Sequence, residues 1–172
     1  MNSALIGHIA RGIIIVLLQG LVFQRIYIGG ASFNYFAFII HPVILMLLPM
    51  KTSRFLLVVI GFVVGLGVDL FYSSLGVHAS AAVFIAFMRP YIMQLLEPRG
   101  GYPVASTPSY RVFGLNWFVR YSALMLILYL MFYFSVEVFT FVYAGQTILK
   151  AISSFVISYL AILAYVILFN PK

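Results

Sequence analysis

The chain has 172 residues, of which 65% are hydrophobic and 8% are charged, and its mean hydropathy is +1.15. Soluble domains are only about half apolar, so this composition indicates an integral membrane protein and leaves no length for a separate soluble domain. The sequence has no cysteine, which excludes disulfides and thiolate metal sites. Its net charge of +7 comes from single Lys and Arg residues between apolar runs, which indicates membrane topology rather than nucleic-acid binding.

The length suits a bundle of membrane-spanning helices, because each crossing needs about 20 residues. We predict one all-α domain over residues 1–172, an integral membrane bundle of six transmembrane helices at 6–25, 33–48, 55–72, 77–96, 115–141 and 147–169. The first apolar run could be the h-region of a signal peptide. The sequence after it is a poor match to a small-x-small cleavage site, so we expect an uncleaved first span.

Proline and glycine residues mark features of the spans and of their connections, in chain order. Pro42 removes a backbone donor inside the second span, so we predict a kink there. Gly61 and Gly65 share one face of the third span, where they allow close approach of another helix. A tight turn ending at Gly76 precedes the fourth span, which Pro90 interrupts. Residues 97–113 are rich in Pro and Gly and predict an aqueous loop.

The distribution of Lys and Arg predicts the orientation, because positive residues near short loops stay in the cytoplasm. With the amino terminus inside, the opposite side holds only Arg25 and Lys150. The cytoplasmic side then holds Arg11, Lys51, Arg54, Arg99, Arg111, Arg120 and Lys172. We therefore expect a multi-pass protein of a bacterial cytoplasmic (inner) membrane with both termini in the cytoplasm.

Ionisable residues inside spans are the candidate functional groups, because each is costly in lipid. Asp69 and His78 flank the turn between the third and fourth spans at similar depth, so they either hydrogen-bond or are hydrated separately near the headgroups. Arg89, beside Pro90, is expected to reach cytoplasmic phosphates or to meet carbonyls that the proline frees. Glu137, near the outer end of the fifth span, is expected to face either a partner protein or water, and water is the simpler expectation.

The sequence does not favour an enzyme. Hydrolases and phosphotransferases in membranes use paired carboxylates, an activated nucleophile or metal-binding acids, whereas this chain has only three acidic residues. Ser153 and Ser154 have no base positioned for them, and the three histidines are too scattered for a metal site. We therefore predict no catalytic residues, no metal and no cofactor.

Two segments flank the turn between the third and fourth spans: Gly65-Leu66-Gly67-Val68-Asp69 and Leu75-Gly76-Val77-His78-Ala79. Together they resemble the signature of the bacterial rod shape-determining protein MreD, most closely in its Bacteroidetes form. The stretches 84–90, 98–102 and 117–118 are also similar, and the order of spans agrees along nearly the whole chain. Many family members have Pro where this chain has Ser74, so the turn departs from the pattern there.

The resemblance implies a non-enzymatic scaffold in the complex that builds the lateral cell wall, with peptidoglycan synthesis and cell shape as its output. The implied partners are MreC, MreB, RodA and a class B penicillin-binding protein, together with membrane lipids and no nucleic acid. In architecture the family also resembles the substrate-binding subunits of ECF vitamin transporters, an analogy of fold only. An ECF-type subunit is therefore the alternative function, with Asn34, Asp69, His78 and Glu137 available toward the outer half.

Two surfaces follow as interaction hypotheses. The helix face with Gly61, Gly65 and Asp69 serves either internal packing or docking of the MreC span. The predicted cytoplasmic loop, with Arg99, Tyr102 and Arg111, is the candidate contact for MreB or for anionic lipid, and membrane-surface anchoring alone is the simpler interpretation.

Overall fold

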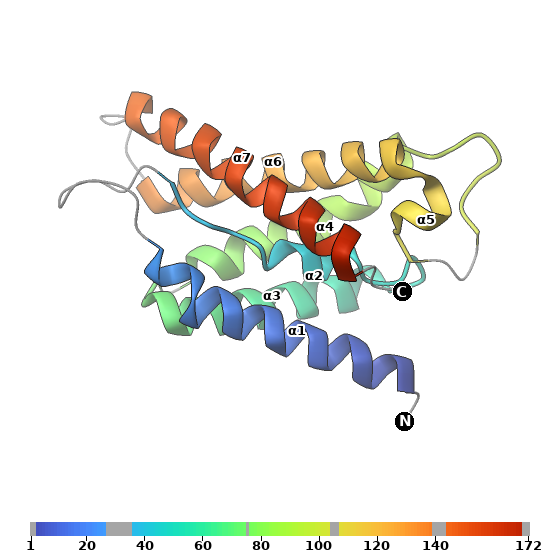
Figure 1. Cartoon of the computed structure of the whole chain (residues 1–172), viewed down its shortest axis with the longest axis horizontal. Coiled ribbons are helices and arrows are strands. Elements are labelled where there is room, and N and C mark those ends of the chain that lie inside the picture. The colour runs from blue at the N-terminus through green and yellow to red at the C-terminus, as the bar shows by residue number, and fades with distance from the viewer. Residues whose placement is uncertain (1–2, 27–35, 75, 104–106, 139–143, 170–172) are drawn as a thin grey trace.

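A computed structural model describes residues 3–26, 36–74, 76–103, 107–138 and 144–169 of the chain. All regular structure in these residues is helical (Figure 1). The elements are α1 Ser3–Leu21, η1 Phe23–Arg25, α2 Pro42–Met46, α3 Arg54–Tyr72, α4 Val77–Leu95, α5 Tyr110–Phe113, α6 Leu115–Val138 and α7 Ala144–Phe169. The helices α3 and α4 begin and end within one residue of the expected spans 55–72 and 77–96.

Among the residues that the structure describes, three helices are long and apolar enough to cross a membrane: α3, α6 and residues Gly145–Phe169 of α7. Their outer surfaces are apolar, with Phe55 80%, Leu70 74% and Leu168 77% exposed. Polar side chains lie inside instead, where Asp69 and Arg89 are each only 1% exposed. Apolar residues outside and polar residues inside are the arrangement that a lipid environment favours.

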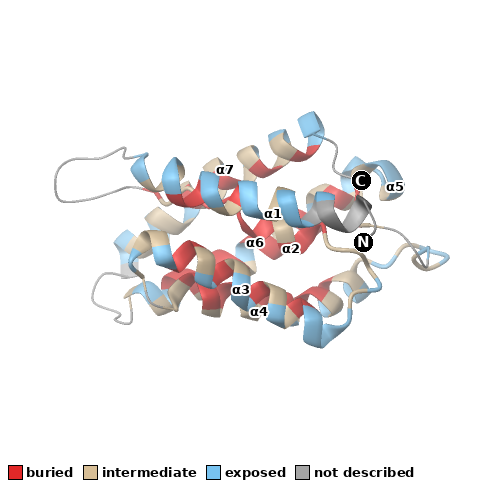
Figure 2. Cartoon of the chain, turned by 90° about the horizontal axis from the view of Figure 1, so that it is seen from below, coloured by how far each residue is buried: buried red, intermediate tan, exposed pale blue. Residues whose placement is uncertain are grey.

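The long helices α3, α4, α6 and α7 pack as successive antiparallel neighbours. The α3–α4 hairpin packs through α4 against α6, α6 packs against α7, and α1 lies along α3 (Figure 1). The short α2 lies in the middle and contacts α3, α4 and α6. Figure 2 shows the buried residues gathered around α2 and α6 and on the inner sides of α3 and α4. The start of α1 and the end of α7 lie at the same end of the bundle as α5 (Figure 1).

The structure differs from the prediction over residues 36–48. A single helix with a kink at Pro42 is wrong for this segment, because residues 36–40 are non-helical and Pro42 is the first residue of α2. At the start of a helix the missing proline N–H leaves no hydrogen bond unmade, so Pro42 begins α2 instead of bending it. The first residues of the predicted span, 33–35, lie outside the described part of the chain.

Three polar side chains from other helices satisfy the backbone of residues 36–40. Ser154 Oγ and Ser158 Oγ of α7 accept hydrogen bonds from the N–H groups of Ala37 (2.8 Å) and Ile39 (2.9 Å). On the other side, Gln19 of α1 accepts from Ile40 N (2.8 Å) and donates to Phe38 O (2.6 Å). Non-helical backbone at membrane depth requires such partners inside the protein. Residues 36–40 are therefore an integral, non-helical part of the bundle.

Candidate functional site

The best-defined polar centre is the carboxylate of Asp69 at the end of α3. Asp69 Oδ2 accepts hydrogen bonds from Gly76 N (3.1 Å) and Ala79 N (2.9 Å), and Oδ1 accepts from His78 N (3.0 Å). Ser74 Oγ donates to the same carboxylate over 2.9 Å. A carboxylate at the amino end of a helix both satisfies free N–H groups and complements the helix dipole, so Asp69 caps α4 from the preceding helix.

The predicted contact between Asp69 and His78 is confirmed. His78 Nδ1 lies 3.0 Å from Asp69 Oδ1, and both side chains are buried. The φ angles of Ser73 (53°) and Gly76 (89°) are left-handed, so the chain reverses within a few residues and brings the two groups together. The alternative that each group is hydrated separately is therefore wrong.

His78 is also part of a histidine–tyrosine cluster, made of His41, Tyr72, His78, Tyr129 and Tyr133, in which Tyr72 is partly buried and the others are buried. The ring centre of His78 lies 4.7 Å from that of Tyr72, 4.9 Å from that of Tyr133 and 5.6 Å from that of His41. His41 Nε2 forms a 2.9 Å hydrogen bond with the Tyr129 hydroxyl. Within the described residues, no three His, Cys, Asp or Glu side chains are grouped so that they could hold a metal ion.

The glycine face of α3 packs inside the molecule against α4. A Cβ added at Gly65 would lie 2.4 Å from Ala79 Cα and 2.7 Å from His78 O. A Cβ added at Gly61 would lie 2.9 Å from Ala82 O. Of the two hypotheses for this face, the structure supports internal packing, because α4 already occupies the surface that a partner span would need.

Arg89 is the second buried charge and lies near the other end of α4. Its Nε donates to the Tyr121 hydroxyl (3.0 Å) and its Nη2 donates to the carbonyl of Leu48. The Tyr121 hydroxyl in turn donates to Met46 O over 3.1 Å. Exposure of 1% contradicts the prediction that this side chain extends to membrane phosphates. The guanidinium does meet a carbonyl, but that carbonyl follows α2 instead of being one that Pro90 frees.

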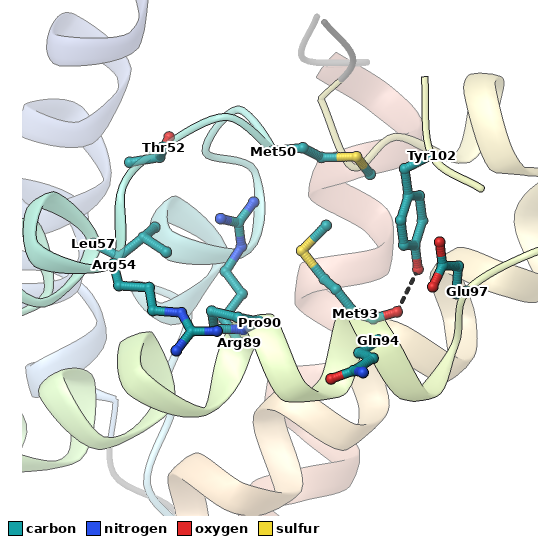
Figure 3. Close-up of a pocket in the computed structure, with 10 residues that line it drawn as sticks. All are labelled: Met50, Thr52, Arg54, Leu57, Arg89, Pro90, Met93, Gln94, Glu97 and Tyr102. Carbon is teal, nitrogen blue, oxygen red and sulfur yellow. Dashed lines mark hydrogen bonds between the residues drawn. The ribbon is translucent and has the colours of Figure 1, made fainter. Parts of the chain in front are cut away.

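A pocket of about 340 Å³ opens beside Arg89, at the end of the bundle that carries α5 (Figure 3). Its charged lining residues are Arg54, Arg89 and Glu97. The remaining lining residues are Met50, Thr52, Leu57, Pro90, Met93, Gln94 and Tyr102. This pocket combines residues from the segment before α3, from α3 and α4 and from the loop after α4, so it forms only when these elements pack together.

The loop after α4 is attached to the bundle through aromatic residues. The Tyr102 hydroxyl donates to Met93 O (2.7 Å), and the Trp117 indole donates to Leu96 O (2.8 Å). Burial raises the pKa of the Tyr102 hydroxyl, and the nearby charge of Glu97 raises it further. Arg99 and Arg111 are exposed, whereas Tyr102 lines the pocket, so the loop candidates do not form one surface.

Four buried polar residues that organise the interior were missed as site candidates: Gln19, Tyr121, Ser154 and Ser158. Gln19 and the two serines bond the non-helical segment, and Tyr121 bonds Arg89. A polar residue in an otherwise apolar span was the available signal for Gln19. Glu137 of α6 forms an ion pair with Lys150 of α7, in which Lys150 Nζ lies 3.0 Å from Glu137 Oε1, so its carboxylate does not face water alone.

No protein-family model, curated protein or solved structure matches the chain.

Proposed function

We propose that this chain is a non-enzymatic scaffold of the bacterial cell-wall elongation complex, with six spans and both termini in the cytoplasm. Its partners in this proposal are MreC, MreB, RodA and a class B penicillin-binding protein. Support comes from the resemblance of the motifs around Asp69 and His78 to the MreD family. The all-helical architecture, with three helices apolar enough to cross a membrane, is compatible with that assignment.

The observation that carries the proposal is that the motif residues Asp69 and Gly65 hold α3 and α4 together. Asp69 binds the amino end of α4, and Gly65 provides the space for Ala79. Both residues therefore serve to hold one helix hairpin rigidly, which is the property that a scaffold needs. A rigid bundle acts on partners through shape and contact, and it needs no group that exchanges protons or electrons with a substrate.

Affinity purification from native membranes tests the proposal. The tagged chain should recover an MreC-type protein together with wall-synthesis enzymes. Recovery of an energising ATPase module without these proteins would overturn the scaffold and favour transport. A variant with Arg99→Glu and Arg111→Glu tests the loop, because both side chains are exposed and their reversal should not disturb the core. Unchanged association with MreB and unchanged cell shape would remove the loop from the proposal.

A transporter subunit of the ECF type is the second candidate, favoured by the histidine–tyrosine cluster. Its five side chains come from α2, α3, α4 and α6 or from residues directly beside them, and they meet at one depth, as a ligand site requires. Saturable binding of a vitamin-sized ligand by the purified chain, abolished by Tyr133→Phe or His78→Gln, would favour this candidate. The scaffold proposal expects no such binding.

A further inference from the structure

The pocket beside Arg89 has charges of opposite sign on opposite sides. Figure 3 shows Arg54 and Arg89 on one side, and Glu97 with Tyr102 on the other. Its volume of about 340 Å³ lies within the range of about 300–1,000 Å³ that small-molecule sites occupy. A site with this distribution of charge suits a ligand that is itself zwitterionic.

The positive side has a donor group that the protein itself does not use, on a side chain that is almost fully buried. Arg89 uses Nε and Nη2 for Tyr121 and Leu48, and its Nη1 donates to no residue in the described part of the chain. Two hydrogen bonds already hold the guanidinium in place, so it loses less conformational entropy on binding an anion than a free arginine would. Arg54 adds a second guanidinium, which stacks 5.6 Å from the centre of the Tyr91 ring.

Helix ends reinforce both sides of the pocket. α3 begins at Arg54, so the positive end of its dipole lies at the arginine side. α4 ends at Leu95, two residues before Glu97, so the negative end of its dipole lies at the carboxylate side. The Tyr102 hydroxyl donates its proton to Met93 O and therefore presents lone pairs that can accept from a cation.

From these observations we propose that the pocket binds the headgroup of an aminophospholipid. The phosphate lies against Arg54 and Arg89, and the ammonium group lies against Glu97 and the Tyr102 hydroxyl oxygen. A phosphate diester with a primary amine is the shared chemistry, and the membrane is its source, because the pocket lies at the end of apolar helices where headgroups gather. This inference goes beyond the scaffold proposal and does not require it.

The test uses the full-length chain, purified and depleted of lipid, in detergent. Native mass spectrometry measures binding of phosphatidylethanolamine and of phosphatidylglycerol, and a third series adds inorganic phosphate as competitor. We expect phosphatidylethanolamine to bind about tenfold more tightly than phosphatidylglycerol, which has no ammonium group for Glu97. Inorganic phosphate at millimolar concentration should leave the bound lipid in place.

Three single variants at exposed positions locate the site without disturbing the core. Arg54→Gln should weaken both lipids about tenfold, because it removes a phosphate contact that they share. Glu97→Gln should weaken only phosphatidylethanolamine, and should do so about tenfold. Arg120→Gln is the matched control: it removes an exposed positive charge outside the pocket, and both affinities should stay unchanged.

Three results would overturn the inference. Equal binding of both lipids, with no effect of Glu97→Gln, would show that the pocket does not recognise the amine. Displacement of the lipid by inorganic phosphate would make a soluble phosphate the ligand. Full lipid affinity in Arg54→Gln would place the lipid elsewhere on the protein.

Discussion

Replacement of Gly65 by alanine tests how closely α3 and α4 approach. The added Cβ would lie 2.4 Å from Ala79 Cα, 2.7 Å from His78 O and 2.8 Å from Ala79 N. All three are backbone atoms, which cannot rotate away as a flexible side chain could, so the helices must separate. Overpacking of this kind costs about 1–3 kcal/mol. Separation also lengthens the bond from Ala79 N to Asp69, and a hydrogen bond to a charged group is worth about 1.5–3 kcal/mol.

Gly65→Ala should therefore lower the free energy of unfolding by about 3 kcal/mol. The assay is unfolding in mixed micelles with increasing SDS, followed by far-UV and near-UV circular dichroism. The matched control is Gly145→Ala in α7, where an added Cβ meets no atom within 4 Å. This control should be as stable as the wild type or slightly more stable, because alanine favours helix over glycine. If the two variants unfolded at the same SDS fraction, the close approach of α3 and α4 would be refuted.

Three further substitutions are measured in the same assay. Asp69→Asn should lower the free energy of unfolding by about 3 kcal/mol, because an amide NH₂ would face two of the N–H groups that now donate to the carboxylate. Wild-type stability would contradict the capping of α4. Ser158→Ala should cost about 1–3 kcal/mol, because it leaves Ile39 N without its acceptor, and a neutral effect would show that this N–H has another partner. Lys150→Gln should cost less than about 1 kcal/mol, because its ion pair with Glu137 is partly exposed; a larger loss would indicate a desolvated pair.

The sequence predicts the long helices because apolar length is a strong signal in a membrane protein. Both α3 and α4 follow from it to within one residue, and the turn between them is visible in Ser73, Ser74 and Gly76. The Asp69–His78 contact is predictable for the same reason: a short turn between antiparallel helices places residues at equal distance from it at equal depth. Local signals suffice where neighbours in sequence are also neighbours in space.

The segment before α2 could not be predicted in this way. Residues 36–40 are as apolar as a span, and nothing in their own composition shows that they are non-helical. Their conformation depends on Gln19 in α1 and on Ser154 and Ser158 in α7, which are distant in sequence. Hydropathy measures whether a segment can lie in lipid, but it does not measure whether another helix offers hydrogen bonds to an extended backbone.

The two buried charges have a common physical basis. Asp69 is bound by N–H groups at the start of α4, and Arg89 is bound by a carbonyl just after the end of α2. Each ion thus meets the end of a helix whose partial charge has the opposite sign, so no ion pair between them is needed. A helix end placed inside the bundle is therefore what allows each charge to be buried. In this chain the carbonyl that Arg89 requires follows the end of the short α2, where helix carbonyls have no partner within the helix.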